Sequence, residues 1–124
     1  MNLLLDTHIL LWWLSGSRRL HAQARKAIAN SGRAFVSAAT VWEITIKIAL
    51  GKLEFLGNVE EQLMLNNFLP LAITVPHAAA AGALPAHHSD PFDRMLIAQA
   101  KIESLTLMTH DVRLRDYDVP VLAI

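Results

Sequence analysis

The feature that most constrains the fold is a series of short apolar runs that alternate with helical patterns along the chain. The first run, "NLLL" at residues 2–5, ends at Asp6 and leads directly into the apolar segment "HILLWWL". Runs this short and continuously apolar are typical of strands that are buried on both faces of a sheet. The expected strands are residues 2–5, 34–37, 71–76, 105–109 and 119–122, and Pro120 places the last at a sheet edge.

The segments between these runs carry helical patterns. The expected helices are residues 8–14, 21–30, 38–50, 58–68, 77–84 and 92–104. In the third, "EITIKI" alternates like a strand, but the length of the segment and the closing Gly51 favour a helix. Strands that alternate with helices predict an α/β fold around a mostly parallel sheet. A chain of 124 residues predicts one domain over residues 1–124.

The composition limits the classes of protein that the chain can belong to. Hydrophobic residues make up 53% and charged residues 18%, which indicates a folded domain. There is no cysteine, which excludes disulfides, thiolate nucleophiles and cysteine zinc sites, and suits the cytoplasmic location that we expect. The net charge is zero, so a nucleic-acid function would have to rest on a particular site. Asp6 and His8 interrupt the N-terminal apolar run, which we interpret as core rather than a signal peptide or membrane span.

Four carboxylates, far apart in the sequence, map to one edge of the predicted sheet. Asp6 ends the first strand, Asp111 follows the fourth, and Glu43 and Asp93 lie in the first turns of helices. In a parallel sheet the carboxyl ends of strands and the amino ends of helices share one edge, where ligands bind.

Each carboxylate also has a structural interpretation. Asp90 followed by Pro91 reads as a helix cap, which makes Asp93 the third helical residue, favoured there by the helix dipole. Likewise "TVWE" at 40–43 matches a capping box that would use Glu43. Asp111 alone would be a turn former, and Asp6 could cap the helix that follows it.

The four acids together indicate a metal site. Clustered carboxylates repel one another and raise each other's pKa values, and a divalent cation removes that penalty. Mg²⁺ and Mn²⁺ prefer oxygen ligands. The residues therefore favour a metal-dependent phosphotransfer site, although they do not require one.

The chain resembles a known family in four ordered segments, from Leu3 to Leu122. These are "LLLDTHILLWWL", "SAATVWEITIKIALGKL", "DPFDRMLIAQA" and "MTHD". They are similar to segments of the PIN-domain ribonucleases, and more narrowly of the VapC toxins of toxin–antitoxin pairs. The resemblance implies a three-layer α/β/α sandwich, Mg²⁺- or Mn²⁺-dependent cleavage of RNA such as tRNA, a homodimer and an antitoxin partner.

The resemblance also assigns site residues. The family's four acids fall on Asp6, Glu43, Asp93 and Asp111, which would bind the metal, directly or through water, and carry the catalysis. Asp90 would then cap the helix and could lie just outside the direct metal ligands. Thr7 and Thr109 stand beside acids, where such domains often place a hydroxyl.

Several basic residues near these acids have two readings each. His8 and His110 could bind the metal or an RNA phosphate, but we expect them to be packed or to support the metal ligands. His87 and His88 resemble a zinc cluster with Asp90, but adjacent histidines cannot easily share one face, so we expect them to be solvated loop residues. Arg94 would contact phosphate or form a salt bridge with a neighbouring acid.

The other marked side chains lie on predicted helices. Lys47 and Lys52 would line an RNA path or a solvated helix face. Trp12 and Trp13 must point in different directions, one into the core and the other towards a dimer or antitoxin surface, with base stacking as a further alternative. The helix "HAAAAGAL" would form dimer interface or core.

Three alternative functions are open at this stage. A flap-type DNA nuclease would need extra helical elements, for which this chain is short. A phosphatase would need a D-x-D nucleophile, and "DTH" lacks the second acid. The chain could also be an inactive PIN-like module that binds RNA or an antitoxin. Such a module would gain nothing from clustered carboxylates in binding a polyanion such as RNA, so the four acids argue against it.

Overall fold

A computed structural model describes residues 1–55 and 57–124 and contains one five-stranded sheet in the order β3-β2-β1-β4-β5. All four strand pairs are parallel. The strands are β1 (Asn2–Leu5), β2 (Arg33–Ser37), β3 (Leu69–Leu71), β4 (Thr106–Thr109) and β5 (Val121–Ala123). The α/β class and the parallel sheet predicted from the sequence are confirmed.

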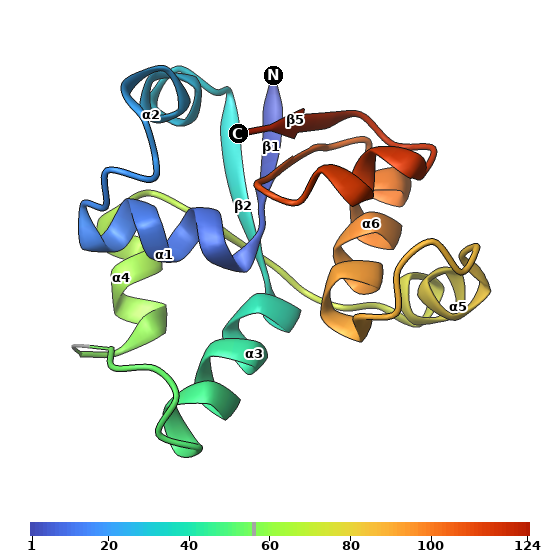
Figure 1. Cartoon of the computed structure of the whole chain (residues 1–124), viewed down its shortest axis with the longest axis horizontal. Helices are drawn as coiled ribbons and strands as arrows, with labels where there is room; N and C mark the ends of the chain where they lie inside the picture. The colour runs from blue at the N-terminus through green and yellow to red at the C-terminus, as the bar shows by residue number, and fades with distance from the viewer. Residues whose placement is uncertain (56) are drawn as a thin grey trace.

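Helices cover both faces of this sheet. They are α1 (Thr7–Ser15), α2 (Ala22–Ala29), α3 (Ala38–Ala49), α4 (Val59–Leu65), α5 (Val75–Ala83) and α6 (Pro91–Glu103), with a short 3₁₀ helix η1 (Val112–Asp116). Figure 1 shows α1, α2 and α4 on one side of β1 and β2, and α5 and α6 on the other. Residues 38–49 are helical as predicted, despite the alternating pattern of "EITIKI".

Two apolar layers hold the helices to the sheet. Leu3 and Leu5 point to one face of β1 and pack with Ile9 and Ile44, whereas Leu4 points to the other and packs with Leu96. All three leucines are fully buried. Burial of one such side chain stabilises the fold by about 1.5–3 kcal/mol, so β1 anchors both layers. The three-layer α/β/α arrangement is confirmed.

The third strand lies earlier than predicted. The sequence pattern placed it at 71–76, but β3 is Leu69–Leu71 and includes Pro70. An edge strand tolerates a proline because one side of its backbone has no partner strand. Thr74 then caps α5, and Pro76 sits in the first helical turn, where its missing N–H costs nothing. Helix α4 also ends at Leu65, three residues before the predicted end at 68.

The strand order creates a switch point between β1 and β4. From β1 the chain builds outwards through β2 and β3, then returns to place β4 on the other side of β1, with Leu4 opposite both Phe35 and Leu107. The loops that follow β1 and β4 therefore diverge, and ligands bind in the crevice between them. Asp6 and the Thr109–Asp111 segment lie at this crevice.

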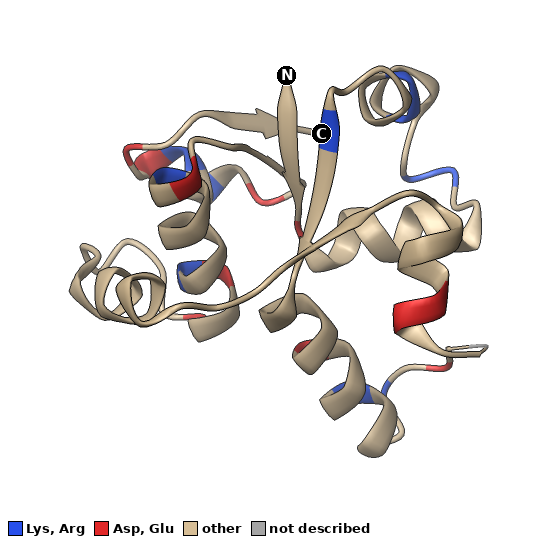
Figure 2. Cartoon of the chain, turned by 180° about the vertical axis from the view of Figure 1, so that it is seen from behind, with Lys and Arg blue, Asp and Glu red and all other residues tan. Residues whose placement is uncertain are grey.

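The basic residues are scattered over several elements rather than concentrated on one (Figure 2). Among the described residues, no helix is long and apolar enough to cross a membrane. Neither the overall charge nor a membrane segment therefore points to a function, whereas the switch-point crevice gathers the acids that the sequence singles out.

Candidate active site

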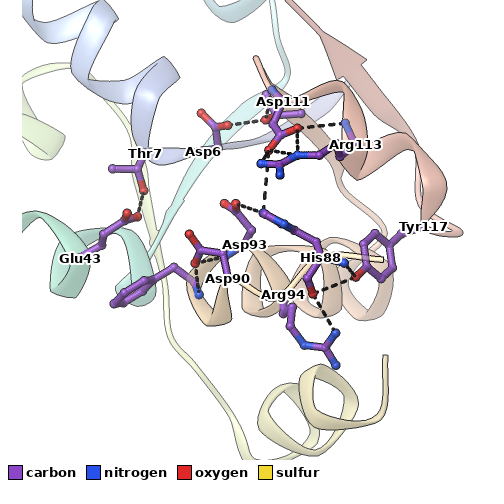
Figure 3. A network of polar contacts seen from close by, with 12 residues as sticks. Asp6, Thr7, Glu43, His88, Asp90, Asp93, Arg94, Asp111, Arg113 and Tyr117 are labelled. Carbon is purple, nitrogen blue, oxygen red and sulfur yellow. Dashed lines mark hydrogen bonds and ion pairs between the residues drawn. The ribbon is translucent and has the colours of Figure 1, made fainter. Parts of the chain in front are cut away.

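A cleft of about 500 Å³ opens at the carboxyl ends of β1 and β4. Its walls carry all four carboxylates that the sequence singled out, and Figure 3 shows them converging from separate elements. The lining residues are Asp6, Thr7, His8, Glu43, His88, Asp90, Asp93, His110, Asp111, Val112 and Arg113. Segments at opposite ends of the chain thus supply one acidic cleft.

Asp6 lies deepest and is 5% exposed. Its Oδ1 accepts a hydrogen bond from the backbone N–H of Ile9 at 2.9 Å, so it caps α1. Its Oδ2 accepts a hydrogen bond from the buried hydroxyl of Thr109. Burial raises the pKa of Asp6 above its usual value in spite of these bonds. Asp6 is therefore both a cap and a buried acid that faces the cleft.

Asp93 lies in the first turn of α6 and contacts His88. His88 Nε2 lies 2.7 Å from Asp93 Oδ2, and the His88 side chain is only 9% exposed. Burial raises the pKa of Asp93 from 3.8 to about 6; the His88 hydrogen bond opposes this, while the negative charges of Asp90 and Asp6 add to it. Asp93 therefore carries a charge that the fold leaves largely uncompensated.

Asp90 caps α6, as the sequence predicted. Its Oδ1 accepts hydrogen bonds from the backbone N–H groups of Phe92 at 2.8 Å and Asp93 at 3.3 Å. Pro91 occupies the first helical position. Oxygens of Asp90 and Asp93 and a ring nitrogen of His88 lie within 4.8 Å of one another. Capping therefore does not remove Asp90 from the cleft.

Glu43 does not take part in a capping box. Helix α3 begins at Ala38 with Ser37 as its cap, three residues before Thr40, so Glu43 lies in the second turn. Its Oε1 accepts a hydrogen bond from the Thr7 hydroxyl at 2.6 Å, and its Oε2 pairs with Lys47 Nζ at 3.0 Å. The capping interpretation of Glu43 is wrong, and its carboxylate is held at the cleft by two partners.

Asp111 forms a bidentate ion pair with Arg113. Arg113 Nε donates to Asp111 Oδ1 at 3.0 Å and Nη2 donates to Oδ2 at 2.6 Å. These hydrogen bonds lower the pKa of Asp111 to about 2. His88 Nε2 lies 3.8 Å from Asp111 Oδ2, so this acid also borders the imidazole that contacts Asp93.

Arg94 shapes the loop that carries His88. Its guanidinium donates to the main-chain carbonyls of Ala81 and Leu84 at the end of α5, and to those of Pro85 and His88 in the following loop. The last carbonyls of a helix lack intrahelical partners, and a cationic side chain satisfies them well. Among the described residues Arg94 forms no ion pair with an acid, so the predicted salt bridge is wrong, and the predicted phosphate contact stays a prediction.

The two loop histidines, His87 and His88, differ in their exposure and contacts. His87 is exposed, as predicted, with its ring 5.0 Å from the Tyr117 ring. His88 is not a solvated loop residue, because the Tyr117 hydroxyl accepts from its backbone N–H at 2.9 Å and Asp93 holds its ring. Sequence reasoning missed His88 and Arg113. The only signal for Arg113 was its position two residues after Asp111, and for His88 its place just before the Asp90 cap.

The two tryptophans point in different directions, as predicted. Trp13 Nε1 donates to Asn66 Oδ1 at 3.0 Å and its ring packs on Phe68. Trp12 turns towards His8 and His110.

The residues of the cleft suit a hard divalent cation. Asp6 and Asp93 are largely buried, both have raised pKa values, and the charge of Asp6 contributes to the raised pKa of Asp93. Within residues 1–55 and 57–124, the lysine and arginine side chains at the cleft form ion pairs with Glu43 and Asp111, and none forms one with Asp6 or Asp93. Oxygen donors with unbalanced negative charge match the preference of Mg²⁺ and Mn²⁺.

The fold and site define a class: doubly wound α/β proteins with a carboxylate-lined cleft at the switch point of a parallel sheet. The chain belongs to the PIN domain family, whose sequence profile matches residues 3–120. It is 32% identical to Ribonuclease VapC22 of Mycobacterium tuberculosis over 127 residues, which cover 96% of this chain and 94% of that protein. The family resemblance predicted from the sequence is confirmed.

Solved structures share the fold at lower identity. A VapBC2 complex from Rickettsia felis, bound to a DNA fragment from its promoter, matches with a TM-score of 0.72 and 12% identity over 99% of this chain and 98% of that one. A toxin–antitoxin complex from Klebsiella pneumoniae matches with a TM-score of 0.70 and 22% identity over 97% and 95% of the two chains. These likenesses support the PIN-like architecture of the whole chain.

Proposed function

We propose that the chain is an endoribonuclease toxin of a toxin–antitoxin pair that uses Mg²⁺ or Mn²⁺. One observation carries the proposal: buried Asp6 and partly buried Asp93, both with raised pKa values, share a cleft with Glu43 and Asp111. The relative named Ribonuclease VapC22 supports RNA as the substrate class.

The four acids divide into two pairs with different tasks. Asp6 and Asp93 would hold the cation, and Glu43 and Asp111 would contribute directly or through water. When bound, a divalent cation activates a water and stabilises the leaving oxygen of a phosphodiester. Thr109 and the amino end of α1 fix the Asp6 carboxylate, and Thr7 fixes Glu43, so the acids are oriented before substrate arrives.

Positive charge borders the acidic cleft on two sides. Lys47 pairs with Glu43, and Arg113 pairs with Asp111 while its side chain is 63% exposed. In Figure 3 Glu43 and Arg113 lie on opposite sides of Asp6 and Asp93. Both cations would attract RNA phosphates that approach the cleft and would reduce repulsion between RNA and the carboxylates.

An antitoxin partner is the second part of the proposal. The structural neighbours from Rickettsia felis and Klebsiella pneumoniae are toxin–antitoxin complexes. This chain has an apolar groove of about 520 Å³ between α1 and the segment before α4, lined mainly by Leu11, Trp12, Leu14, Leu53 and Phe55. An amphipathic antitoxin segment would bury its apolar side chains there. A homodimer and a tRNA target stay predictions.

The test is a cleavage assay with matched nucleic acids. Purified protein is incubated with a mixed RNA pool and with single-stranded DNA, each with Mg²⁺, Mn²⁺ or EDTA, beside the variant Asp93→Asn. We expect RNA cleavage that requires metal and is lost in the variant. Cleavage of DNA alone would favour the DNA nuclease. Intact RNA, including tRNA, with folded wild-type protein would refute the nuclease and favour the inactive module.

A further inference from the structure

A second hollow of about 410 Å³ adjoins the acidic cleft, and its residues have no place in the catalytic scheme above. It is lined by His8, Trp12, Arg19 and His110, and we call it the Trp12 hollow. His8 and His110 also line the acidic cleft, so the two spaces are continuous. In the sequence, His8 follows Asp6 by two residues and His110 directly precedes Asp111.

The hollow is built from three aromatic rings and one guanidinium. The ring centroids of Trp12 and His110 are 5.1 Å apart at an interplanar angle of 71°, and those of His8 and Trp12 are 6.0 Å apart. The Arg19 guanidinium lies 5.9 Å from the Trp12 ring. His110 Nδ1 lies 2.8 Å from the main-chain oxygen of Ile124, which fixes the imidazole. The rings therefore form a preorganised surface.

The groups of the hollow remain accessible. His8, Arg19 and His110 are exposed, and Trp12 is partly buried with one side packed on the apolar core. Among the residues that the structure describes, the ion pairs within 4.0 Å do not include Arg19. Within the described part of the chain, the hollow thus offers aromatic surface and a positive charge that has no ion pair, next to the carboxylates.

This combination matches the way in which proteins hold single-stranded nucleic acid. Bases stack on aromatic side chains, an arginine near the rings adds cation–π and phosphate contacts, and the arrangement tolerates any base. A cleft lined with carboxylates repels the phosphates that do not face the metal, so a stacking site beside it would offset that repulsion. The hollow contains the guanidinium of Arg19, whereas the groove that shares Trp12 with it contains the carboxylate of Glu54, so the charge of the hollow suits a nucleotide phosphate better.

We propose that the Trp12 hollow binds a nucleotide that flanks the cleaved phosphodiester, with its base against Trp12 and His110 and its phosphate at Arg19. This inference rests on the proposed ribonuclease function. It assigns Trp12, His110 and Arg19 as substrate-positioning residues, which act on RNA binding rather than on the chemical step.

The test uses an RNA oligonucleotide that the wild-type protein cleaves, together with copies in which an abasic nucleotide replaces each base that flanks the cleavage point. The variants are Trp12→Leu, His110→Ala and Arg19→Ala. Trp42→Leu and Arg33→Ala are matched controls, because Trp42 and Arg33 are exposed and line other hollows. Binding of the intact RNA is also measured with Asp93→Asn, alone and combined with each variant, so that affinity is read without cleavage.

We expect Trp12→Leu to raise KM and Kd for intact RNA by about 5- to 150-fold with little change in kcat, as loss of one stacked base predicts. For one abasic substrate the same substitution should have almost no effect, because the base that it contacts is already missing. A merely structural role of Trp12 would penalise both substrates equally.

The outcomes separate this inference from the function on which it rests. An equal penalty on all substrates, or unchanged KM and Kd in Trp12→Leu and His110→Ala, would overturn the nucleotide site while RNA cleavage by the wild type stands; the hollow would then have another occupant, such as a protein segment. If Trp12→Leu does not fold, His110→Ala and Arg19→Ala decide. Wild-type protein that cleaves no RNA would refute both proposals.

Discussion

Replacing Asp93 with asparagine should stabilise the metal-free protein and abolish cleavage. The pKa of Asp93 is raised from 3.8 to about 6, chiefly by burial and further by the charges of Asp90 and Asp6. A raised pKa in the folded state means that folding favours the neutral carboxyl group. The stabilisation is complete below about pH 4 and is lost as the pH rises through about 6. Above that pH the ionised carboxylate weakens the fold.

The size of the effect follows from the shift in pKa. A rise in the pKa of Asp93 from 3.8 to about 6 corresponds to an upper limit of ~3 kcal/mol. The Asp93 side chain is 24% exposed, so solvent screens little of this cost. Asparagine has nearly the same shape, and its Oδ1 still accepts a hydrogen bond from His88. We therefore expect Asp93→Asn to raise the free energy of unfolding by about 2–3 kcal/mol at neutral pH.

The assay is urea unfolding with EDTA present, near neutral pH and again at about pH 4.5, where the difference between wild type and variant should shrink. Asp111→Asn is the matched control, because Arg113 lowers the pKa of Asp111 to about 2. Here the ionised form is favoured, so this variant should be slightly less stable at neutral pH, and the deficit should vanish as the pH falls towards 2. If Asp93→Asn destabilises the protein at neutral pH, or if its effect does not depend on pH, the reasoning is refuted.

Three further predictions concern the residues around the acids. Thr109→Val removes the hydroxyl that donates to the buried Asp6; it should weaken Mn²⁺ binding about 10- to 100-fold, which titration calorimetry would detect. Glu43→Gln keeps an acceptor for Thr7 and loses the ion pair with Lys47. We expect kcat to fall about 10- to 100-fold while the free energy of unfolding changes by less than about 1 kcal/mol. A loss of stability large enough to explain the fall in kcat would contradict a role at the metal. Arg94→Lys keeps the charge, but a lysine cannot donate to four carbonyls at once. The substitution should lower the free energy of unfolding, measured in urea, by about 1.5–3 kcal/mol and should reduce cleavage by releasing the loop that carries His88. Unchanged stability would count against that role of Arg94.

Much of the fold and the gathering of the acids followed from local patterns. The apolar run ending at Asp6 predicted a buried strand, and a parallel sheet brings strand ends and helix starts to one edge. The cap at Asp90 was equally readable, because Asp-Pro before an apolar helix is a local signal. These features depend on neighbouring residues in the sequence.

The features that the sequence does not predict depend on contacts between segments that are distant along the chain. His88 reaches Asp93 because Arg94 and Tyr117 hold the loop after α5, and no pattern in "PAHHSDP" encodes that path. Strand β3 was misplaced because a proline in an apolar run indicates the end of a strand unless the strand is known to lie at an edge. Both failures reflect tertiary context that overrides local preference.

The four carboxylates form two unequal pairs, and this difference bears on how the site works. Glu43 and Asp111 each form an ion pair with a basic side chain, Lys47 and Arg113, which balances their charge without a metal. Asp6 is buried and Asp93 is partly buried, and the charge of each is opposed by desolvation. A bound divalent cation would therefore relieve the inner pair most, and the free energy released there would contribute to its affinity. Loss of Asp6 or Asp93 should abolish metal binding, whereas loss of Glu43 or Asp111 should weaken it.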